Sequence, residues 1–392
     1  MRVFLLDVLC TVPYYLGALC LALRRAGAET TLGCTNYYQD LDHFPSRGLR
    51  PDPGAVDLVA RFASGNATVR RPLKLIEGCL NLAALGVRFL LHRPDVLHVQ
   101  YLSLVPYGVP FDIWLVKWAR FLGSRLVYTV HDRLPHDTGT RYHERFARLY
   151  RMFDGVVCHN EDTRKRLAEE FHVEASRIRV IPHGPLFADL QEVPPDQARA
   201  RLGLPDDAAV VLWQGILKPY KGVDYLLDAW ALVVRERPRA MLLVVGTGEA
   251  ELLDGIRRHV EKLGLEANVK LDFRYVPEAH MAACYSASDV VVYPYREITT
   301  SGALMTGLAQ RKALIATRLP AFLEVVEDGE SARLVDYGDR AQLAHVIVEL
   351  LGDPAQRERL ASGAERVMNE RFGWDAIAAQ TLSLYRDLLA AR

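Results

Sequence analysis

The sequence predicts an α/β protein with two parallel sheets, each covered by helices on both faces. Short apolar runs with little alternation recur along the chain, as expected for strands that are buried on both sides. Nearly every run is followed by a helical pattern, which is the order of a parallel sheet. The 392 residues, 50% of them hydrophobic and 24% charged, are enough for two domains. Two such series indicate two Rossmann-like domains.

The first series fills the first half of the chain. Its strands are expected at residues 2–9, 29–34, 95–100, 125–130, 154–159 and 177–182. Helical spacing of apolar residues fills the gaps between them, at residues 14–26, 72–92, 107–122 and 161–171.

The second series follows a proline-rich boundary. Residues between about 184 and 208 combine four prolines with polar residues and lack a strong strand pattern. Beyond them, strands are expected at residues 209–215, 240–246, 268–273, 289–294 and 313–317. We therefore expect domains over 1–185 and 206–372. The final segment, 373–392, has helical spacing and could pack on either domain.

Charge and cysteine content limit the function classes. The net charge is zero, but residues 1–190 hold 24 Lys and Arg against 19 Asp and Glu. This basic half suits either a solvated helix face or an anionic membrane surface, and no nucleic-acid partner is expected. Residues 2–9 lack the cleavage site of a signal peptide, and the six cysteines form no CxxC pair. We expect a cytoplasmic protein, with membrane contact as an alternative.

The strand-loop-helix unit over residues 289–317 is the strongest functional pattern. Its helix opens on Ser301 and Gly302, and the free N–H groups of a helix start favour an anion such as a diphosphate. Glu297 lies a few residues before that helix and could accept hydrogen bonds from sugar hydroxyls. A second loop, QGILKPYKG (214–222), brings Lys218 and Lys221 close to another helix start. Together they predict a site for a nucleotide sugar.

In this order, the motifs resemble those of the family 4 glycosyltransferases of GT-B fold. They are TVHDRLPHD (129–137), VIPHG (180–184), QGILKPYKG, VVGTGE (244–249), YVPE (275–278), YPYREITTSG (293–302) and the closing FGWD helix. The resemblance covers essentially the whole chain. It implies two Rossmann-like domains facing across a cleft, with the last helix crossing back to the first domain. The first domain would bind the acceptor and the second the donor.

The resemblance also implies a role for individual residues. Lys218 and Lys221 would bind the diphosphate, Glu297 the transferred sugar, and His131 the donor near the reacting carbon. The remaining donor-binding residues would be Gly215, Tyr275, Val276, Thr300, Ser301, Gly302, Ala303 and Leu304. Two positions depart from the family. Ile216 follows Gly215 at a place where many members carry Arg, and Met305 stands eight residues after Glu297, where a second glutamate normally binds the ribose.

The implied reaction is retaining transfer of a sugar from a UDP- or GDP-sugar to an acceptor hydroxyl, in polysaccharide, glycolipid or glycoconjugate biosynthesis. The acceptor would be a sugar or a lipid-linked sugar. No cofactor and no metal are expected, because lysines and helix ends neutralise the phosphates. A GT-B-like phosphorylase or epimerase, or a sugar-nucleotide binder without activity, remains as an alternative.

The sequence also contains weaker candidate patterns for a functional site. Asp132, His136 and His183 lie close to the expected cleft, and His183 could equally serve a turn. The D-x-D triplet of Asp40 and Asp42 matches a metal site of another transferase fold, but such a triplet is common by chance. VVGTGEAE (244–251) lacks the third glycine of a dinucleotide fingerprint, which disfavours a dehydrogenase. No histidine-rich metal spacing is apparent in the sequence.

Overall fold

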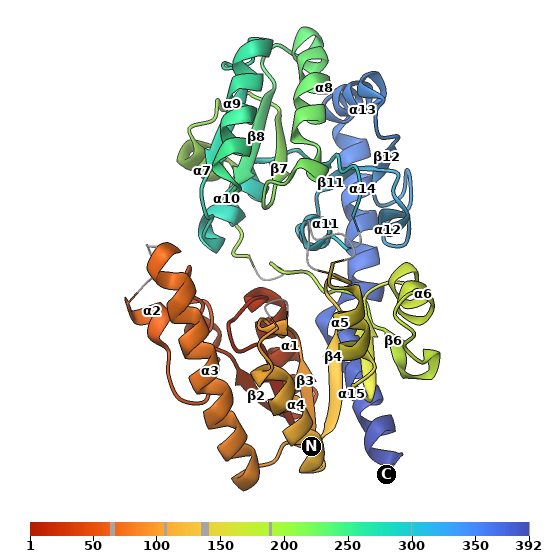
Figure 1. Ribbon diagram of the computed structural model, residues 1–392. Coiled ribbons are helices and arrows are strands. Elements are labelled where there is room, and N and C mark those ends of the chain that lie inside the picture. The colour runs from red at the N-terminus through yellow and green to blue at the C-terminus, as the bar shows by residue number, and fades with distance from the viewer. Residues whose placement is uncertain (63–66, 106–107, 135–140, 188–189, 299, 392) are drawn as a thin grey trace. The chain divides into compact units, whose positions relative to one another are not determined.

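The computed structural model describes residues 1–392 except 63–66, 106–107, 135–140, 188–189, 299 and 392 (Figure 1). The chain divides into two compact units. The first unit consists of Met1–Gly184 together with Gly373–Arg392, and the second of Pro185–Phe372. The expected α/β class with two parallel sheets is confirmed.

A six-stranded parallel sheet forms the centre of the first unit. Its strand order is β2-β1-β3-β4-β5-β6, and Val3 of the inner strand β1 pairs with Thr30 on one side and Val96 on the other. Apolar runs without alternation suit this arrangement because both faces of the sheet are covered. The strands are β1 Arg2–Leu6, β2 Glu29–Gly33, β3 Val96–Val99, β4 Arg125–Thr129, β5 Gly155–Cys158 and β6 Ile178–Val180.

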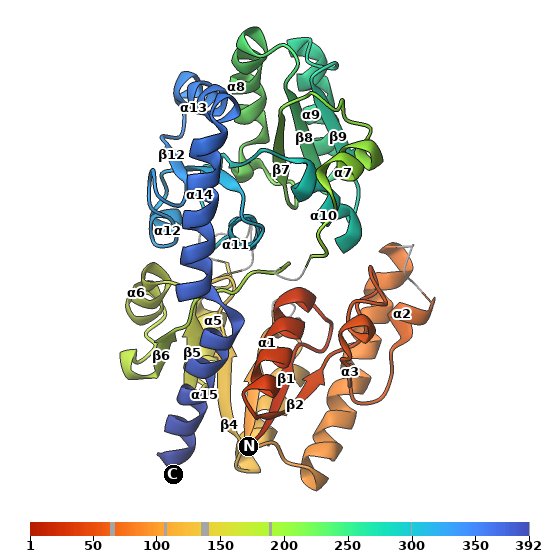
Figure 2. The same cartoon turned by 180° about the vertical axis from the view of Figure 1, so that it is seen from behind.

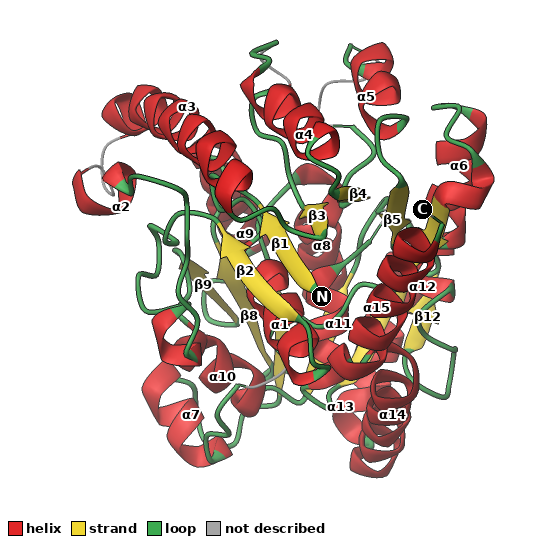
Figure 3. Cartoon of the chain, turned by 90° about the horizontal axis from the view of Figure 1, so that it is seen from below, coloured by secondary structure: helices red, strands yellow, loops and turns green. Residues whose placement is uncertain are grey.

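Helices cover both faces of this sheet. Helices α3 and α4 pack on each other over one face, and α1 and α15 pack on each other over the opposite face (Figure 3). The helix expected over 107–122 begins only at Phe111, because Pro110 occupies its N-cap. The helices are α1 Pro13–Arg25, α2 Leu58–Phe62, α3 Ala67–Leu91, α4 Phe111–Phe121, α5 His143–Tyr150, α6 Glu161–Glu169 and α15 Trp374–Ala390.

The second unit has its own six-stranded parallel sheet, in the order β12-β11-β10-β7-β8-β9. The edge strand β12 was not expected, because a three-residue run carries too little pattern to stand out. The strands are β7 Val210–Gln214, β8 Met241–Gly246, β9 Val269–Phe273, β10 Val290–Tyr293, β11 Ala313–Thr317 and β12 Arg333–Val335.

Helices also cover both faces of the second sheet. Helix α8 packs on α13, α7 packs on α10, and α14 packs on α11 and β11 (Figure 2). Trp213 of β7 and Trp230 of α8 are completely buried in its core. The helices are α7 Pro195–Leu202, α8 Val223–Glu236, α9 Ala250–Leu263, α10 Glu278–Ala287, α11 Gly302–Ala309, α12 Pro320–Leu323, α13 Arg340–Gly352 and α14 Pro354–Val367.

The proline-rich stretch expected as a linker belongs to the second unit. It contains α7, which packs against α10, and Ala198 and Leu202 of α7 are buried in the same core as Cys284. The second unit therefore starts at Pro185 rather than at residue 206, because this short apolar helix face needs a partner. Among the described residues, no helix is long and apolar enough to cross a membrane.

Candidate active site

Two glycines bring the ends of β7 and β8 into close contact. Gly215 has φ +150° and Gly246 has φ +147°, a region that side-chain-bearing residues rarely adopt. A Cβ atom on Gly246 would lie 1.8 Å from the carbonyl oxygen of Gly215, so no larger residue fits there. A Cβ atom on Gly215 would lie 3.1 Å from Nζ of Lys221. The glycines thus leave the space into which the Lys221 ammonium reaches.

Lys221 is held inside the second unit at the carboxyl edge of the sheet. It ends the short 3-10 turn Pro219–Lys221, and Gly222, in the left-handed conformation, connects this turn to α8. The ammonium lies 5.6 Å from the ring centroid of Tyr295. Burial lowers the pKa of Lys221 to about 8, and the charge of Lys218 contributes in the same direction. A partly desolvated ammonium of this kind is stabilised by a bound anion.

Lys218 is placed differently from Lys221. Its Nζ atom lies 2.9 Å from Oε1 of Glu249, which is the N-cap residue of α9. This ion pair is exposed on the Glu249 side, where screening by water keeps such a pair weak. Of the two expected phosphate ligands, Lys221 is therefore the one fixed by its surroundings.

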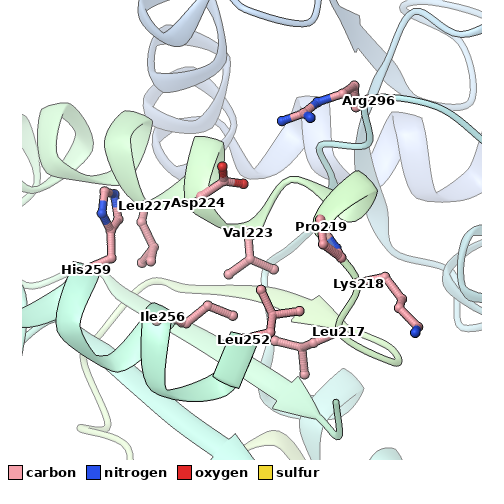
Figure 4. Close-up of a pocket in the computed structure, with 11 residues that line it drawn as sticks. Leu217, Lys218, Pro219, Val223, Asp224, Leu227, Leu252, Ile256, His259 and Arg296 are labelled. Carbon is pink, nitrogen blue, oxygen red and sulfur yellow. The ribbon is translucent and has the colours of Figure 1, made fainter. Parts of the chain in front are cut away.

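A pocket lies between α8 and α9 beside the same loop (Figure 4). It has a volume of about 210 Å³ and is lined mainly by apolar side chains, including Leu217, Leu227 and Ile256. Lys218 is the only one of the expected donor-site residues among the residues that line it. In Figure 4, the Lys218 ammonium points away from His259 at the far end of the pocket. The pocket therefore lies beside the loop of Lys218 and Lys221, and Lys221 is not among the residues that line it.

The loop of Glu297 lies against the turn of Lys221. The backbone N–H of Arg296 donates to the carbonyl oxygen of Tyr220 at 2.7 Å. A Cβ atom on Gly222 would lie 2.0 Å from the carbonyl oxygen of Pro294, so the two backbones touch. These contacts place the exposed carboxylate of Glu297 on the loop next to the buried ammonium. The four residues that join the loops lie within the two motifs of the sequence analysis, but no local pattern predicts that these motifs touch each other.

Helix α11 starts directly after this loop. Ser301 is its N-cap, and the hydroxyl oxygen accepts a hydrogen bond from the backbone N–H of Leu304 at 3.1 Å. Leu304 itself is buried, whereas Thr300, Gly302 and Ala303 are partly exposed. A cap of this kind leaves the other first N–H groups of the helix available to an external acceptor.

The expected base-binding loop follows β9. Val276 is buried in the core, whereas Tyr275 is partly exposed. Asp272 accepts from both of its neighbours, at 2.7 Å from Nε of Arg274 and 2.8 Å from Nε2 of His280. The ion pair with Arg274 and the hydrogen bond with His280 fix the course of the chain around Tyr275.

The first unit presents His131 at the carboxyl end of β4. Its Nε2 atom lies 3.1 Å from Oε1 of Gln100, and its Nδ1 atom lies 3.4 Å from Nε2 of His159. Burial, followed by the neighbouring histidines, holds the pKa of His131 well below its usual range. The ring packs against Tyr15 with the centroids 4.7 Å apart. Both ring nitrogens therefore have partners within the unit.

The weaker candidates are spread over the first unit. The backbone N–H of Asp42 donates to Oδ1 of Asp40 at 3.2 Å, in a loop where Asp42 is exposed. This contact makes the triplet an ordinary turn. Asp132 is partly exposed next to His131, and His136 lies outside the described residues.

Comparison with known families identifies two matching regions. Residues 12–184 match the model described as "Glycosyltransferase Family 4", and residues 208–353 match "Glycosyl transferases group 1". The chain is 31% identical over 319 residues to the D-inositol 3-phosphate glycosyltransferase of Thermobispora bispora, covering 76% of this chain and 71% of the relative. The chain belongs to glycosyltransferase family 4.

A second relative matches this chain over a shorter stretch. The D-inositol 3-phosphate glycosyltransferase of Thermomonospora curvata is 32% identical over 249 residues, covering 59% of this chain. The match spans 56% of the length of that relative.

Solved structures show that the family 4 chain has the GT-B fold. HepE of Anabaena in complex with UDP and glucose superposes with a TM-score of 0.76 and 18% identity, covering 99% of this chain and 100% of HepE. Sucrose-phosphate synthase of Thermosynechococcus elongatus superposes with a TM-score of 0.74 and 22% identity, covering all of both chains. At these identities the likeness concerns the fold alone.

The structure gives a physical reason for the departure from the family 4 pattern at Met305. Met305 is 2% exposed and packs in the core of the second unit beside Leu308 and Tyr293. A carboxylate with this side-chain direction would be buried among apolar groups, where the charged form is unfavourable. The place of the second acid is therefore filled by core packing in this chain.

Proposed function

We propose that this family 4 protein transfers a sugar from a UDP- or GDP-sugar to an acceptor hydroxyl, with retention at the anomeric carbon. The observation that carries the proposal is the contact between the Lys221 turn and the Glu297 loop at the carboxyl edge of one sheet. It brings a buried ammonium next to an exposed carboxylate and a capped helix start. A diphosphate needs positive groups such as the ammonium and the helix start. A sugar hydroxyl next to it needs a hydrogen-bond acceptor such as the carboxylate.

The residues of the second unit would bind the donor. Lys221 and the N–H groups at the start of α11 would hold the diphosphate and stabilise the negative charge that develops on it as the sugar leaves. Lys218 would add a weaker, screened charge. Glu297 would accept hydrogen bonds from hydroxyls of the sugar and so fix its orientation.

The remaining donor contacts are assigned from the places of the residues in the second unit. Gly215 would leave room for the phosphate, and the loop of Tyr275 and Val276 would carry the base. The ribose would be held without a second glutamate, since Met305 is buried. The departing phosphate would accept the acceptor proton, and no metal ion would be needed at the diphosphate.

The first unit would receive the acceptor. His131 was expected to touch the sugar, but its ring nitrogens lie beside Gln100 and His159, so the proposal assigns the sugar contact to Glu297. The acceptor would be a sugar, a sugar carried on a lipid, or an inositol phosphate as named for the relatives. We place the reaction in the cytoplasm, at or near the inner face of the membrane.

The direct test is release of nucleoside diphosphate. The protein is incubated with UDP-glucose, other UDP-sugars and GDP-sugars, each with an acceptor panel that includes D-inositol 3-phosphate. We expect one donor to be consumed only when an acceptor is present, and the product to keep the donor's anomeric configuration by NMR. Epimerised donor without acceptor, or glycoside cleavage driven by inorganic phosphate, would instead support the epimerase or phosphorylase. Donor binding without consumption would support a sugar-nucleotide-binding protein without activity.

A further inference from the structure

Three histidines of the first unit come together although they are far apart in the sequence. His131 follows β4, His159 follows β5 and His183 follows β6, and these strands are neighbours in the sheet. Because parallel strands end at the same edge, the three rings converge there. One ring nitrogen from each lies within 4.8 Å of those of the other two.

Hydrogen bonds fix the proton on two of the rings. Nδ1 of His159 lies 3.0 Å from the carbonyl oxygen of Ile181, and Nδ1 of His183 lies 2.6 Å from the carbonyl oxygen of Gly184. A carbonyl oxygen only accepts, so each Nδ1 atom carries a proton. In a neutral imidazole the lone pair is then on Nε2.

The third ring completes the set. Nε2 of His131 lies 3.1 Å from Oε1 of Gln100, and when it donates to that oxygen the lone pair of the ring is on Nδ1. This lone pair faces the lone pair of His159 Nε2 at 3.4 Å. Two acceptors at that distance repel each other unless a positive centre lies between them.

Each ring that donates from one nitrogen and keeps its lone pair on the other is neutral, as the hydrogen bonds to Ile181 and Gly184 indicate for His159 and His183. Neutral imidazole is the form that binds a metal ion, whereas a protonated ring cannot. The Asp132 carboxylate is close enough to favour positive charge at His159.

We propose that His131, His159 and His183 bind one zinc ion. In a tetrahedral site with Zn–N bonds of about 2.0–2.1 Å, two ligand nitrogens are roughly 3.3–3.4 Å apart. The distance between Nδ1 of His131 and Nε2 of His159 is 3.4 Å. A ring nitrogen of His183 lies within 4.8 Å of the other two and would complete the set once the ring moves closer, which leaves the fourth position for water or another oxygen ligand.

The surroundings of the rings match those of zinc-binding histidines. Such a histidine usually donates its second N–H to a carbonyl or carboxamide oxygen, which fixes the ring. Gln100, Ile181 and Gly184 supply these acceptors here. The Tyr15 ring packs over the cluster, with centroid distances of 4.7 Å to His131 and 4.9 Å to His183.

This proposal does not depend on the proposed sugar transfer. The three histidines belong to the first unit, whereas the diphosphate is assigned to lysines of the second. If zinc binds, His131 is a metal ligand rather than a contact of the donor sugar.

Metal binding by the whole protein is the first test. The protein is stripped with a chelator, exchanged into metal-free buffer and titrated with zinc chloride. We expect one equivalent of zinc by elemental analysis after desalting and a higher melting temperature. Cobalt(II) should give the visible absorption of a tetrahedral ion with nitrogen ligands. Absence of stoichiometric metal together with an unchanged melting temperature would overturn the proposal.

Variants locate the ion. His159→Ala and His183→Ala should each lower zinc affinity on the order of a hundredfold or more, from the loss of one of three ligands. His98→Asn is the control, because His98 is also buried at the same sheet but is hydrogen-bonded to Thr129 and Tyr385 outside the cluster. It should lower the melting temperature and leave zinc binding intact. Equal zinc binding by all three variants would place the metal elsewhere.

A purely hydrogen-bonded cluster predicts a different result. If Gln100 turned its NH2 group toward His131, that ring would donate to His159 and no cation would be needed. The cluster variants would then lose the same stability with and without zinc. Cobalt spectra of the unaltered protein decide the matter even if the variants fail to fold.

Discussion

Lys221 is the residue whose loss should affect activity most. Its ammonium is confined by Gly215 and Tyr295 at the end of the sheet, yet it contributes little to the apolar core. Lys221→Ala should keep the fold and lower kcat/KM on the order of a hundredfold or more, since one charge-assisted donor to a developing diphosphate contributes roughly 2–4 kcal/mol. Lys218→Ala, the matched control, should lose less. A Lys221 variant with near-normal turnover would contradict the phosphate assignment.

Burial of Lys221 also predicts how donor binding depends on pH. The pKa is lowered to about 8 in the free protein, and only the charged ammonium attracts a diphosphate. UDP affinity should therefore fall as the pH rises through about 8, by up to roughly tenfold per pH unit. Calorimetry from about pH 7 to about pH 9 measures this fall. Lys221→Arg, which stays charged, should flatten the profile, and an equally steep profile in that variant would point to another group.

Glu297 is expected to contact the sugar and not the phosphate. Glu297→Gln keeps the shape and one acceptor oxygen but loses charge-assisted hydrogen bonds, which are roughly twice as strong as neutral ones. Turnover should fall steeply while the affinity for bare UDP or GDP hardly changes. Measuring both quantities on one variant separates the two contacts. Equal weakening of diphosphate and sugar-nucleotide binding would make the loop a structural support.

Helices α3 and α4 present apolar side chains to solvent. The Nε1–H of Trp118 donates to the carbonyl oxygen of Gly86 and ties the two helices together. Their exposed apolar side chains include Leu90, Leu91, Trp114 and Phe121, with Lys117 on the same helix as the last two. Aromatic and basic groups together favour an anionic membrane surface.

We therefore predict peripheral binding to anionic vesicles. The protein should sediment with vesicles of phosphatidylglycerol and phosphatidylcholine and not with phosphatidylcholine alone. Phe121→Ser should reduce the bound fraction severalfold, because a large apolar side chain is lost from the contact. Leu323→Ser, at another exposed apolar position, in the second unit, is the control. Equal binding by both variants would rule out the α3 and α4 surface.

At the level of elements, the sequence predicted most of the strands, but it did not predict the shortest elements. Long apolar runs such as 209–215 were recognised because burial on both faces leaves a continuous pattern. Strand β12 and helix α7 were not, since three residues or a short polar helix carry little periodicity.

Residues that act through tertiary contacts were the hardest to predict. The contact of Arg296 with Tyr220 and the burial of Met305 depend on how two loops pack, which no local pattern records. His131 and His183 were considered separately, but their convergence with His159 was overlooked, because the spacing of the three histidines in the sequence follows the lengths of the intervening helices. A search for histidines just after successive strands would have found them.

For the molecule as a whole, the groups proposed to bind the diphosphate and the histidine cluster belong to different units. Excess EDTA should therefore leave the affinity for UDP unchanged, because lysines and a helix start supply the positive potential. Calorimetric titrations with and without the chelator measure this. Loss of UDP binding on chelation, restored by a divalent cation, would mean that a metal serves the diphosphate after all.

The first unit is assembled from both ends of the chain. Helix α15 packs on α1, and Tyr385 of α15 is hydrogen-bonded to His98 of β3. During synthesis, the ribosome must therefore complete the whole second unit before the segment that covers α1 emerges. Until then the side of α1 that α15 will cover stays open to water, where chaperones or other nascent chains can reach it. A chain that ends just before Gly373 should therefore contain a second unit able to fold and a first unit with an uncovered apolar helix.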